Sequence, residues 1–209
     1  MKNNKLIVIF GPSASGKTTL AETLNKNYGI PKIISTTSRH IRNNETDGVD
    51  YNFISLKEFD EFVIQDKFIE HTEYNGNHYG YLKKDVQKHL DNYHISSVIV
   101  DINGLERFKH YYRNHVLSVH LGARRLELCK RIQDRSIEDV NEVEQFNIYE
   151  RIKSVDKELA YWVYADIAIN TTDLIPITVA EIVYEHTKNA IALYKNIEKL
   201  KGDFNYELK

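Results

Sequence analysis

The residues with the clearest chemical potential form a glycine-bounded loop close to the N-terminus. The loop runs Gly11-Pro12-Ser13-Ala14-Ser15-Gly16-Lys17-Thr18. It follows an apolar run at residues 6–10 and precedes a helical pattern at residues 19–24, an order typical of a phosphate-binding P-loop. Its glycines allow backbone amides to approach an oligophosphate, and the helix N-terminus adds positive potential there. Lys17 can reach the β- and γ-phosphates, and the Thr18 hydroxyl can bind Mg²⁺.

Composition and charge narrow the classes of protein to which the chain can belong. The 209 residues suffice for one sizeable domain, and a net charge of −2 with an isoelectric point of about 6.5 argues against a broad nucleic-acid-binding surface. Cys129 is the only cysteine, which excludes an internal disulfide and fits a reducing compartment. No apolar run approaches the ~18 residues of a membrane span. We therefore expect a soluble, cytoplasmic protein that binds neither nucleic acid nor membrane.

Apolar runs that alternate with helical patterns predict an α/β fold around a parallel sheet. We predict core strands at residues 6–10, 32–35, 97–102, 116–121 and 165–170, and helices at 85–91 and 176–200. The long runs are continuous and rich in β-branched residues, as buried parallel strands are. Asp101 lies near the end of one run, where its carboxylate either faces a metal or a second substrate or caps the next turn.

A small β-rich segment is inserted after the second predicted core strand. It is predicted to contain a strand at 51–54, a helix at 56–63 capped by Ser55, and a β-hairpin formed by 68–74 and 75–81. Its first part is polar and carries Arg39 and Arg42, three positions apart. An exposed arginine pair is commonly only a solvated surface. Beside a P-loop, however, two guanidinium groups can grip the phosphate of a second substrate with bidentate hydrogen bonds.

A helical, highly charged stretch occupies residues 123–161. Its basic residues include Arg124, Arg125, Lys130, Arg131, Arg135 and Arg151, which are mixed with acidic ones. Composition alone indicates a solvated helical face. A mobile cover that closes over phosphates would instead supply these arginines only when the site shuts.

Further motifs follow one another along most of the chain. They are Ser35-Thr36-Thr37-Ser38-Arg39-His40-Ile41-Arg42, Asp47-Gly48-Val49-Asp50-Tyr51-Asn52-Phe53, Phe68-Ile69-Glu70, Gly76-Asn77-His78-Tyr79-Gly80, Val100-Asp101-Ile102, Glu158-Leu159-Ala160-Tyr161 and Ile169-Asn170. Together with the loop they resemble the guanylate kinase family. The resemblance implies a P-loop NTPase-type parallel sheet flanked by helices, with a small β-rich nucleotide-binding lobe and a helical lid. It divides the single domain 1–209 into a core (1–34, 82–122 and 160–200), the lobe (35–81) and the lid (123–159).

The resemblance also implies roles for individual residues. Lys17 would bridge the transferring phosphate, with Arg42, Arg135 and Arg151 as further catalytic residues. ATP would be bound by Gly11, Ser13, Ala14, Ser15, Gly16, Lys17, Thr18, Thr19, Arg131 and Asn170, with Mg²⁺ on Thr18. GMP would be bound by Ser35, Arg39, Arg42, Tyr51, Glu70, Tyr79 and Asp101. Glu70 would accept hydrogen bonds from the N1–H and the amino group of guanine.

Several features depart from the family pattern, among them His71, where the family commonly has Trp, and a longer stretch between Arg135 and Arg151. Tyr81 stands where the family usually has a small hydroxyl residue that helps to read the guanine, and Asn103 stands in place of an acidic residue. The bulk of the phenol implies a base pocket altered in shape more than in strength, since one neutral hydrogen bond contributes only ~0.5–1.5 kcal/mol.

These observations leave three hypotheses, two for an enzyme and one for a protein of another class. The first is ATP- and Mg²⁺-dependent phosphoryl transfer to a nucleoside monophosphate, foremost GMP or dGMP, by a monomer or homodimer. The second keeps the fold but changes the acceptor to another nucleotide or a ribose bisphosphate, for which Tyr81 leaves room. The third is a non-catalytic binding module, against which the intact Lys17 and Thr18 argue. The strand and helix around the loop likewise argue against a glycine turn without a ligand.

Overall fold

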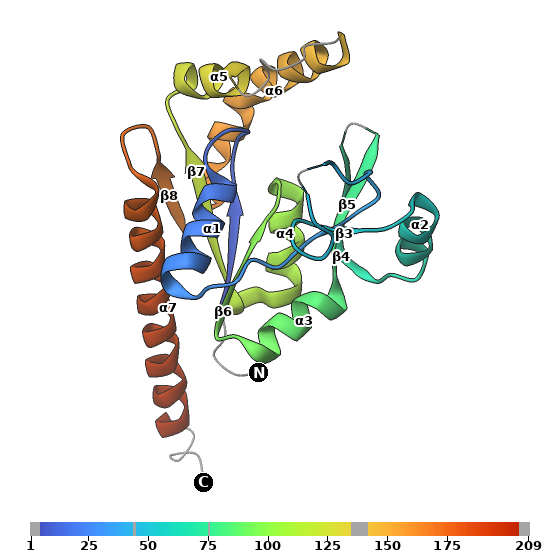
Figure 1. The fold of residues 1–209 in the computed structure, drawn as a ribbon. Coiled ribbons are helices and arrows are strands. Elements are labelled where there is room, and N and C mark those ends of the chain that lie inside the picture. Colours follow the sequence, from blue (N-terminus) through green and yellow to red (C-terminus); the bar gives the residue numbers. More distant parts are fainter. Residues whose placement is uncertain (1–4, 44, 75, 135–141, 205–209) are drawn as a thin grey trace.

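A four-stranded parallel sheet forms the centre of the protein. The computed structural model describes residues 5–43, 45–74, 76–134 and 142–204. The strand order is β6-β1-β7-β8, with β1 at Lys5–Phe10, β6 at Ile95–Ile99, β7 at Val116–Gly122 and β8 at Ile167–Asn170. All three pairings are parallel, so the carboxyl ends of the strands lie at one edge, where the loop 11–16 leaves β1 (Figure 1).

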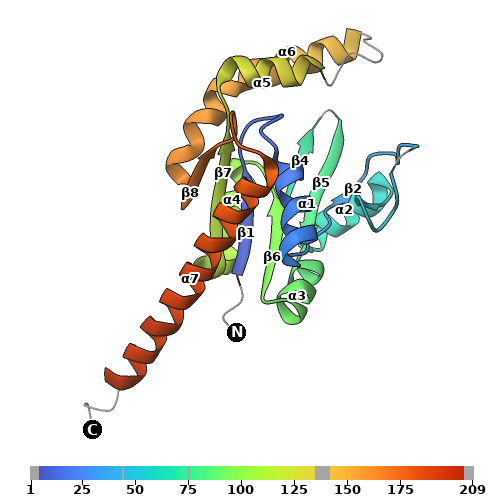
Figure 2. The same ribbon diagram turned by 60° about the vertical axis from the view of Figure 1, so that its left-hand side comes forward.

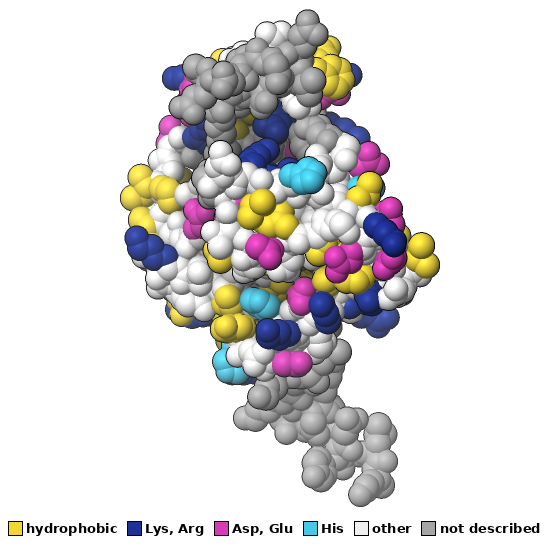
Figure 3. Space-filling model, turned by 45° about the vertical axis from the view of Figure 1, so that its right-hand side comes forward, with side chains coloured by type: hydrophobic (Ala, Val, Ile, Leu, Met, Phe, Trp, Pro, Cys, Tyr) yellow, Lys and Arg dark blue, Asp and Glu magenta, His cyan; other side chains and the backbone are white. Residues whose placement is uncertain are grey.

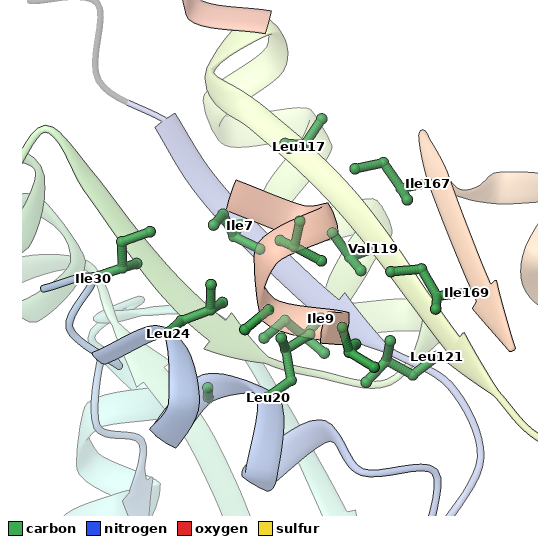
Figure 4. Close-up of a cluster of buried hydrophobic side chains, with 14 residues drawn as sticks. Ile7, Ile9, Leu20, Leu24, Ile30, Leu117, Val119, Leu121, Ile167 and Ile169 are labelled. Carbon is green, nitrogen blue, oxygen red and sulfur yellow. The ribbon is translucent and has the colours of Figure 1, made fainter. Parts of the chain in front are cut away.

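Helices cover both faces of this sheet, which is why β1 and β7 are buried along their whole length. The helices are α1 (Lys17–Tyr28), α2 (Leu56–Ile64), α3 (Lys83–Asn92), α4 (Ile102–Tyr112), α5 (Arg125–Asp134), α6 (Glu142–Ala160) and α7 (Pro176–Phe204), with 3-10 turns at Arg113–His115 and Tyr161–Tyr164. Side chains of α1 and α7 pack on one face of the sheet, where Leu20 and Leu24 lie against Ile7, Ile9 and Val119 (Figure 4). Side chains of α3 and α4 pack on the other face.

The strands of the lobe form a second sheet, whose last strand ends one residue beyond the lobe. Its order is β3-β2-β5-β4, with β2 at Thr36–Thr37, β3 at Asn52–Phe53, β4 at Phe68–Tyr74 and β5 at Asn77–Leu82. The predicted hairpin is confirmed as β4 and β5, and Ser55 caps α2 by accepting a hydrogen bond from the Glu58 amide at 3.2 Å. Phe59 of α2 stacks on Phe68 of β4, which gives the lobe its own small core.

The structure corrects two of the predicted core strands. Residues 32–35 form only a single bridge, between Lys32 and Ser97, because the chain leaves the sheet edge immediately to enter the lobe. The strand predicted at 97–102 ends at Ile99, since Asp101 begins helix α4 by accepting from the Gly104 amide at 2.8 Å. That helix, over residues 102–112, was not predicted.

Helices α5 and α6, which fall in the range expected for the lid, lie at the opposite end of the molecule from the end of the C-terminal helix α7 (Figure 2). Helices α5 and α6 run together above the carboxyl edge of the core sheet, while α7 continues past the sheet in the other direction (Figure 2). Residues of α5 and α6 share a buried cluster that includes Leu128, Ile132 and Val155. Within the described residues, no helix combines the length and the apolar character needed to cross a membrane. The cytoplasmic location stays a prediction.

Gly11 is predicted to tolerate no side chain, and Gly29 supplies the matched comparison. A Cβ at Gly11 would lie 2.1 Å from the Leu121 carbonyl oxygen, whereas one at Gly29 would have nothing within 4 Å. Both have positive φ, 130° and 64°, so both variants carry backbone strain. We expect Gly11→Ala to lower the free energy of unfolding by more than ~3 kcal/mol and Gly29→Ala by only ~1–2 kcal/mol. Urea denaturation measures both; equal losses would contradict the close approach of the loop to β7.

Candidate functional site

The loop 11–16 wraps around the end of β1 in an unusual backbone conformation. Gly11, Ala14 and Gly16 all have positive φ, and such left-handed residues in a turn build the concave rows of amides that bind anions. The Lys17 ammonium group lies over the loop, because its Nζ donates to the Gly11 and Pro12 carbonyls at 2.7 Å each. The loop therefore places a cation beside its own amides.

Contacts with the ends of β7 and β8 hold this loop in place. The Thr171 hydroxyl lies 3.2 Å from the Ser15 carbonyl and 3.1 Å from the Gly122 carbonyl, and is buried. Ala14 packs in the same apolar cluster as α5 and α6, so the lid is seated directly on the loop. Asn170 precedes Thr171 at the end of β8, where its amide oxygen accepts from the Thr172 amide and hydroxyl.

Arg39 is buried in the lobe rather than solvated. Its guanidinium group bonds the Glu45 carboxylate at 2.6 Å, and the exposed fractions of the two side chains are only 12% and 14%. It also donates to the His40 carbonyl at 2.9 Å and lies 5.4 Å from the centre of the Tyr51 ring. The hydrogen bond from Arg39 lowers the pKa of Glu45, which stays ionised.

The second predicted arginine is placed differently. Arg42 is exposed, and its backbone amide, at 3.0 Å, donates to the same Glu45 carboxylate that binds Arg39. Tyr51 and Tyr79 stand edge to face with ring centres 5.9 Å apart, and Tyr79 lies near Arg39. Glu45 was missed by the sequence analysis. Its position in the polar stretch after the two arginines was the available signal.

Glu70 and Asp101 meet where β4 passes the start of α4. A Cβ on Gly104 would lie 3.4 Å from the Glu70 carboxyl carbon, so the absence of a side chain there leaves room for the carboxyl group. Burial, followed by the charge of Asp101, raises the pKa of Glu70 to about 8. Asp101 itself is exposed and caps α4. The capping role considered for this residue is therefore confirmed, and it places a second carboxylate beside the first.

Tyr81 does not project into open space. Its side chain is 5% exposed and packs edge-on against Phe108 with ring centres 5.5 Å apart. The hydroxyl donates to the Ile99 carbonyl at 2.9 Å and accepts from the Ile99 amide at 3.1 Å.

A buried histidine behind the loop was also missed. His120 is 3% exposed, and because a carbonyl oxygen only accepts, its Nε2 donates to the Glu158 carbonyl at 3.0 Å. Burial, and after it the nearby charge of Lys17, lowers the pKa of His120. The ring therefore joins α6 of the lid to β7 as a neutral group. Its position inside a continuous apolar strand gave no signal of this.

A hollow is visible in the upper part of the face shown in Figure 3, and Lys and Arg side chains lie in it. Cations gathered in a concave surface suit an anionic ligand.

Comparison with known proteins identifies the family. A sequence model described as guanylate kinase matches residues 3–183, most of the chain. The chain belongs to the guanylate kinase family. It is 34% identical to the guanylate kinase of Clostridium perfringens strain SM101 over 212 positions, which cover 99% of this chain and 95% of that protein. It is also 34% identical to the Fusobacterium nucleatum guanylate kinase over 161 residues, 77% of this chain and 86% of that protein.

Solved structures support the same fold. A crystal structure of guanylate kinase from Anaplasma phagocytophilum superposes with a TM-score of 0.66, covering 89% of this chain and 85% of that one at 22% identity. The predicted P-loop NTPase-type α/β fold is thereby confirmed, as is the resemblance from which the lobe and lid were inferred. The chain is accordingly a member of a family of nucleoside monophosphate kinases.

The arginines predicted to belong to the lid of this guanylate kinase family member lie in different surroundings. Arg131 bonds Glu127 one turn earlier at 2.8 Å, and Arg151 is half-buried on α6. Arg135 lies outside the described residues. Thr18 and Thr19 are exposed at the start of α1, as is Asn170 at the end of β8. In the described part of the chain, no three His, Cys, Asp or Glu side chains gather closely enough to hold a metal ion.

Replacing Glu70 by Gln is expected to change the pH dependence of stability. The pKa of the buried carboxyl group is about 8 in the folded protein and near 4.5 in an unfolded chain, so the wild-type protein loses stability as the pH rises from 4.5 through 8. Gln cannot ionise. We therefore expect the Tm of Glu70→Gln relative to wild type to rise between pH 6 and pH 9. Glu73→Gln, at an exposed position of the same strand, is the control; parallel profiles for all three proteins would show that Glu70 is not buried as described.

Proposed function

We propose that this protein transfers the γ-phosphoryl group of ATP to GMP or dGMP, giving the nucleoside diphosphate and ADP. One observation carries the proposal: the fold combines an intact P-loop with a second site in which Arg39 is held against Tyr51 and Tyr79. The first site suits a nucleoside triphosphate, and the second offers a fixed guanidinium group to a monophosphate. The relatives named guanylate kinase support GMP as the acceptor.

The chemistry requires two anions to be held in line while their charges are neutralised. Two unit charges 4 Å apart repel by ~4 kcal/mol at an effective dielectric constant near 20. Lys17, the loop amides and the arginines answer this repulsion. The hydroxyl of Thr18, exposed at the start of α1, would hold Mg²⁺ together with phosphate oxygens, a ligand set that suits this ion. When bound, Mg²⁺ supplies further neutralisation of the phosphate charge.

The acceptor monophosphate is assigned to Ser35, Arg39, Arg42, Tyr51 and Tyr79. Arg39 is already fixed by Glu45 and by the His40 carbonyl, so little side-chain entropy remains to be lost on binding. A guanidinium group has five N–H donors, which leaves donors for the phosphate after these bonds are made.

The guanine base is assigned to Glu70 and Asp101. Guanine offers the N1–H and the amino group as neighbouring donors, whereas adenine lacks donors at these positions. An ionised Glu70 carboxylate accepts both. Asp101 lies beside Glu70 and is exposed, so it extends the acceptor surface.

The lid is proposed to complete the site. Arg135 and Arg151 would enter with the lid as catalytic residues, and Arg131 with Asn170 would contact ATP. Closure would exclude water, which favours transfer to GMP over hydrolysis of ATP. In this scheme the core, the lobe (35–81) and the lid (123–159) move against one another within one domain. A monomer or homodimer suffices.

The proposal predicts which acceptor the purified protein will phosphorylate. With ATP and Mg²⁺, GMP should react faster than AMP, CMP, UMP or ribose bisphosphates in a coupled assay of ADP release. Lys17→Ala should lower kcat by at least ~100-fold, because it removes the cation beside the loop. Lys26→Ala, an exposed change on the same helix, should leave kcat unchanged. ADP release at background level with every acceptor would instead favour a binding module.

A second prediction concerns protons. At pH 7.5 free Glu70, with a pKa of about 8, is mostly protonated, but guanine requires the carboxylate. GMP binding should therefore release a proton, and KM for GMP should fall as the pH rises from 6.5 to 8.5. Calorimetry in buffers of different ionisation enthalpy counts the protons released by wild type and by Glu70→Gln. Equal release from both proteins would remove Glu70 from base recognition.

A further inference from the structure

The hydroxyl group of Tyr81 replaces a peptide group at the edge of the core sheet. It donates to the Ile99 carbonyl oxygen at 2.9 Å and accepts from the Ile99 amide at 3.1 Å. The Ser35 side chain lies near the same hydroxyl. A phenol has one donor and two acceptor positions, so the Ile99 carbonyl takes its donor and the Ile99 amide takes one of its acceptor positions.

Strand β6 lies at the edge of the core sheet. Two successive sets of hydrogen bonds satisfy backbone groups on its outer side. At Ser97, the amide donates to the Pro31 carbonyl at 2.9 Å and the carbonyl accepts from the Ile33 amide at 2.8 Å. Two residues further along, Ile99 presents its amide and carbonyl to the same side, where Tyr81 binds both. The phenol thus continues the pairing that the main chain stops making when it turns into the lobe.

Both chain connections of the lobe meet at this point. Ser35 is the first residue of the lobe and Tyr81 the last, by the boundaries given above. Their side chains lie near each other, and the Tyr81 hydroxyl is bonded to β6 of the core. In the lobe sheet Tyr81 of β5 lies opposite Glu70 of β4. The strand that carries Glu70, the residue proposed to bind guanine, is therefore paired with the strand that Tyr81 ties to the core.

We propose that Tyr81 is a positioning residue for the acceptor: its hydroxyl fastens the end of the lobe to the core sheet, near Ser35 at the start of the lobe, and so positions Ser35 and Glu70 for GMP. The inference rests on the proposed function, in which these two residues bind GMP. Tyr81 acts through them and makes no contact with the reacting groups. Its ring, packed on Phe108, gives the hydroxyl a rigid support.

Tyr81→Phe tests this role because it removes the hydroxyl and keeps the ring. The Ile99 amide should lose its partner, and its hydrogen exchange, measured by NMR, should accelerate by about tenfold or more. KM for GMP should rise about 3- to 10-fold, which corresponds to ~0.7–1.4 kcal/mol of lost binding free energy. KM for ATP and kcat should stay within about twofold, since the P-loop is not touched.

Tyr112→Phe is the matched control. Tyr112 stacks on Phe108 of the same cluster, with ring centres 6.0 Å apart, and is partly buried. Loss of the Tyr112 hydroxyl group should change neither the KM for GMP nor hydrogen exchange at the Ile99 amide. Combining Tyr81→Phe with Ser35→Ala adds a double-mutant cycle: if Tyr81 acts through Ser35, the double variant should have nearly the KM for GMP of Ser35→Ala.

The other possible results contradict either the role inferred for Tyr81 or the proposed function on which that role rests. Unchanged exchange at Ile99 in Tyr81→Phe would show that the tie does not exist. A lower Tm with unchanged KM for GMP, or equal rises in both KM values, would reduce Tyr81 to a packing residue. If wild type fails to phosphorylate GMP, the proposed function falls and the kinetic role of Tyr81 with it, while exchange at Ile99 still reports on the tie alone. If the panel identifies another acceptor, KM for that acceptor replaces KM for GMP.

Discussion

Close contact between the loop 11–18 and the ends of β7 and β8 is the constraint on which the site depends. A side chain at Gly11 would collide with the Leu121 carbonyl, and Thr171 bridges the loop to Gly122. Ala14 packs with α5 and α6, so the same contact seats the lid. The loop and the sheet are therefore held together by steric fit and neutral hydrogen bonds. The shape of the loop does not depend on a bound anion and is set before any phosphate arrives.

Charged groups around the proposed acceptor site are compensated within the free protein. Arg39 is paired with Glu45, and burial raises the pKa of Glu70 so that it is largely neutral at pH 7. Neither group is left as an uncompensated buried charge, which would be costly. In the proposed reaction GMP changes this balance in two ways. Its phosphate binds the Arg39 guanidinium group, and its base requires Glu70 to lose a proton. Ligand binding and protonation are coupled in such a site.

The lobe depends on the core for its placement because its own sheet is small. It is joined to the core by two chain connections, and its strands β2 and β3 have only two residues each. Pairing along the outer side of β6 begins with main-chain groups at Ser97 and continues with the Tyr81 hydroxyl at Ile99. A side chain thereby does at the boundary of the lobe what a longer strand would otherwise do. Tyr81, which departs from the family pattern, is accordingly part of the structure that joins the lobe to the core.

The sequence by itself determined the P-loop, the α/β class, the β4–β5 hairpin, the Ser55 cap and the family, because each rests on local spacing, periodicity or ordered motifs. Only the tertiary structure decided that residues 32–35 bridge rather than form a strand and that Asp101 starts α4. It alone also paired Arg39 with Glu45, raised the pKa of Glu70 and turned the Tyr81 hydroxyl toward Ile99. These features arise from burial and from contacts between segments distant along the chain or folded back on themselves. Local residue patterns do not encode which partner a buried polar group finds, since that depends on how the sheets and helices pack.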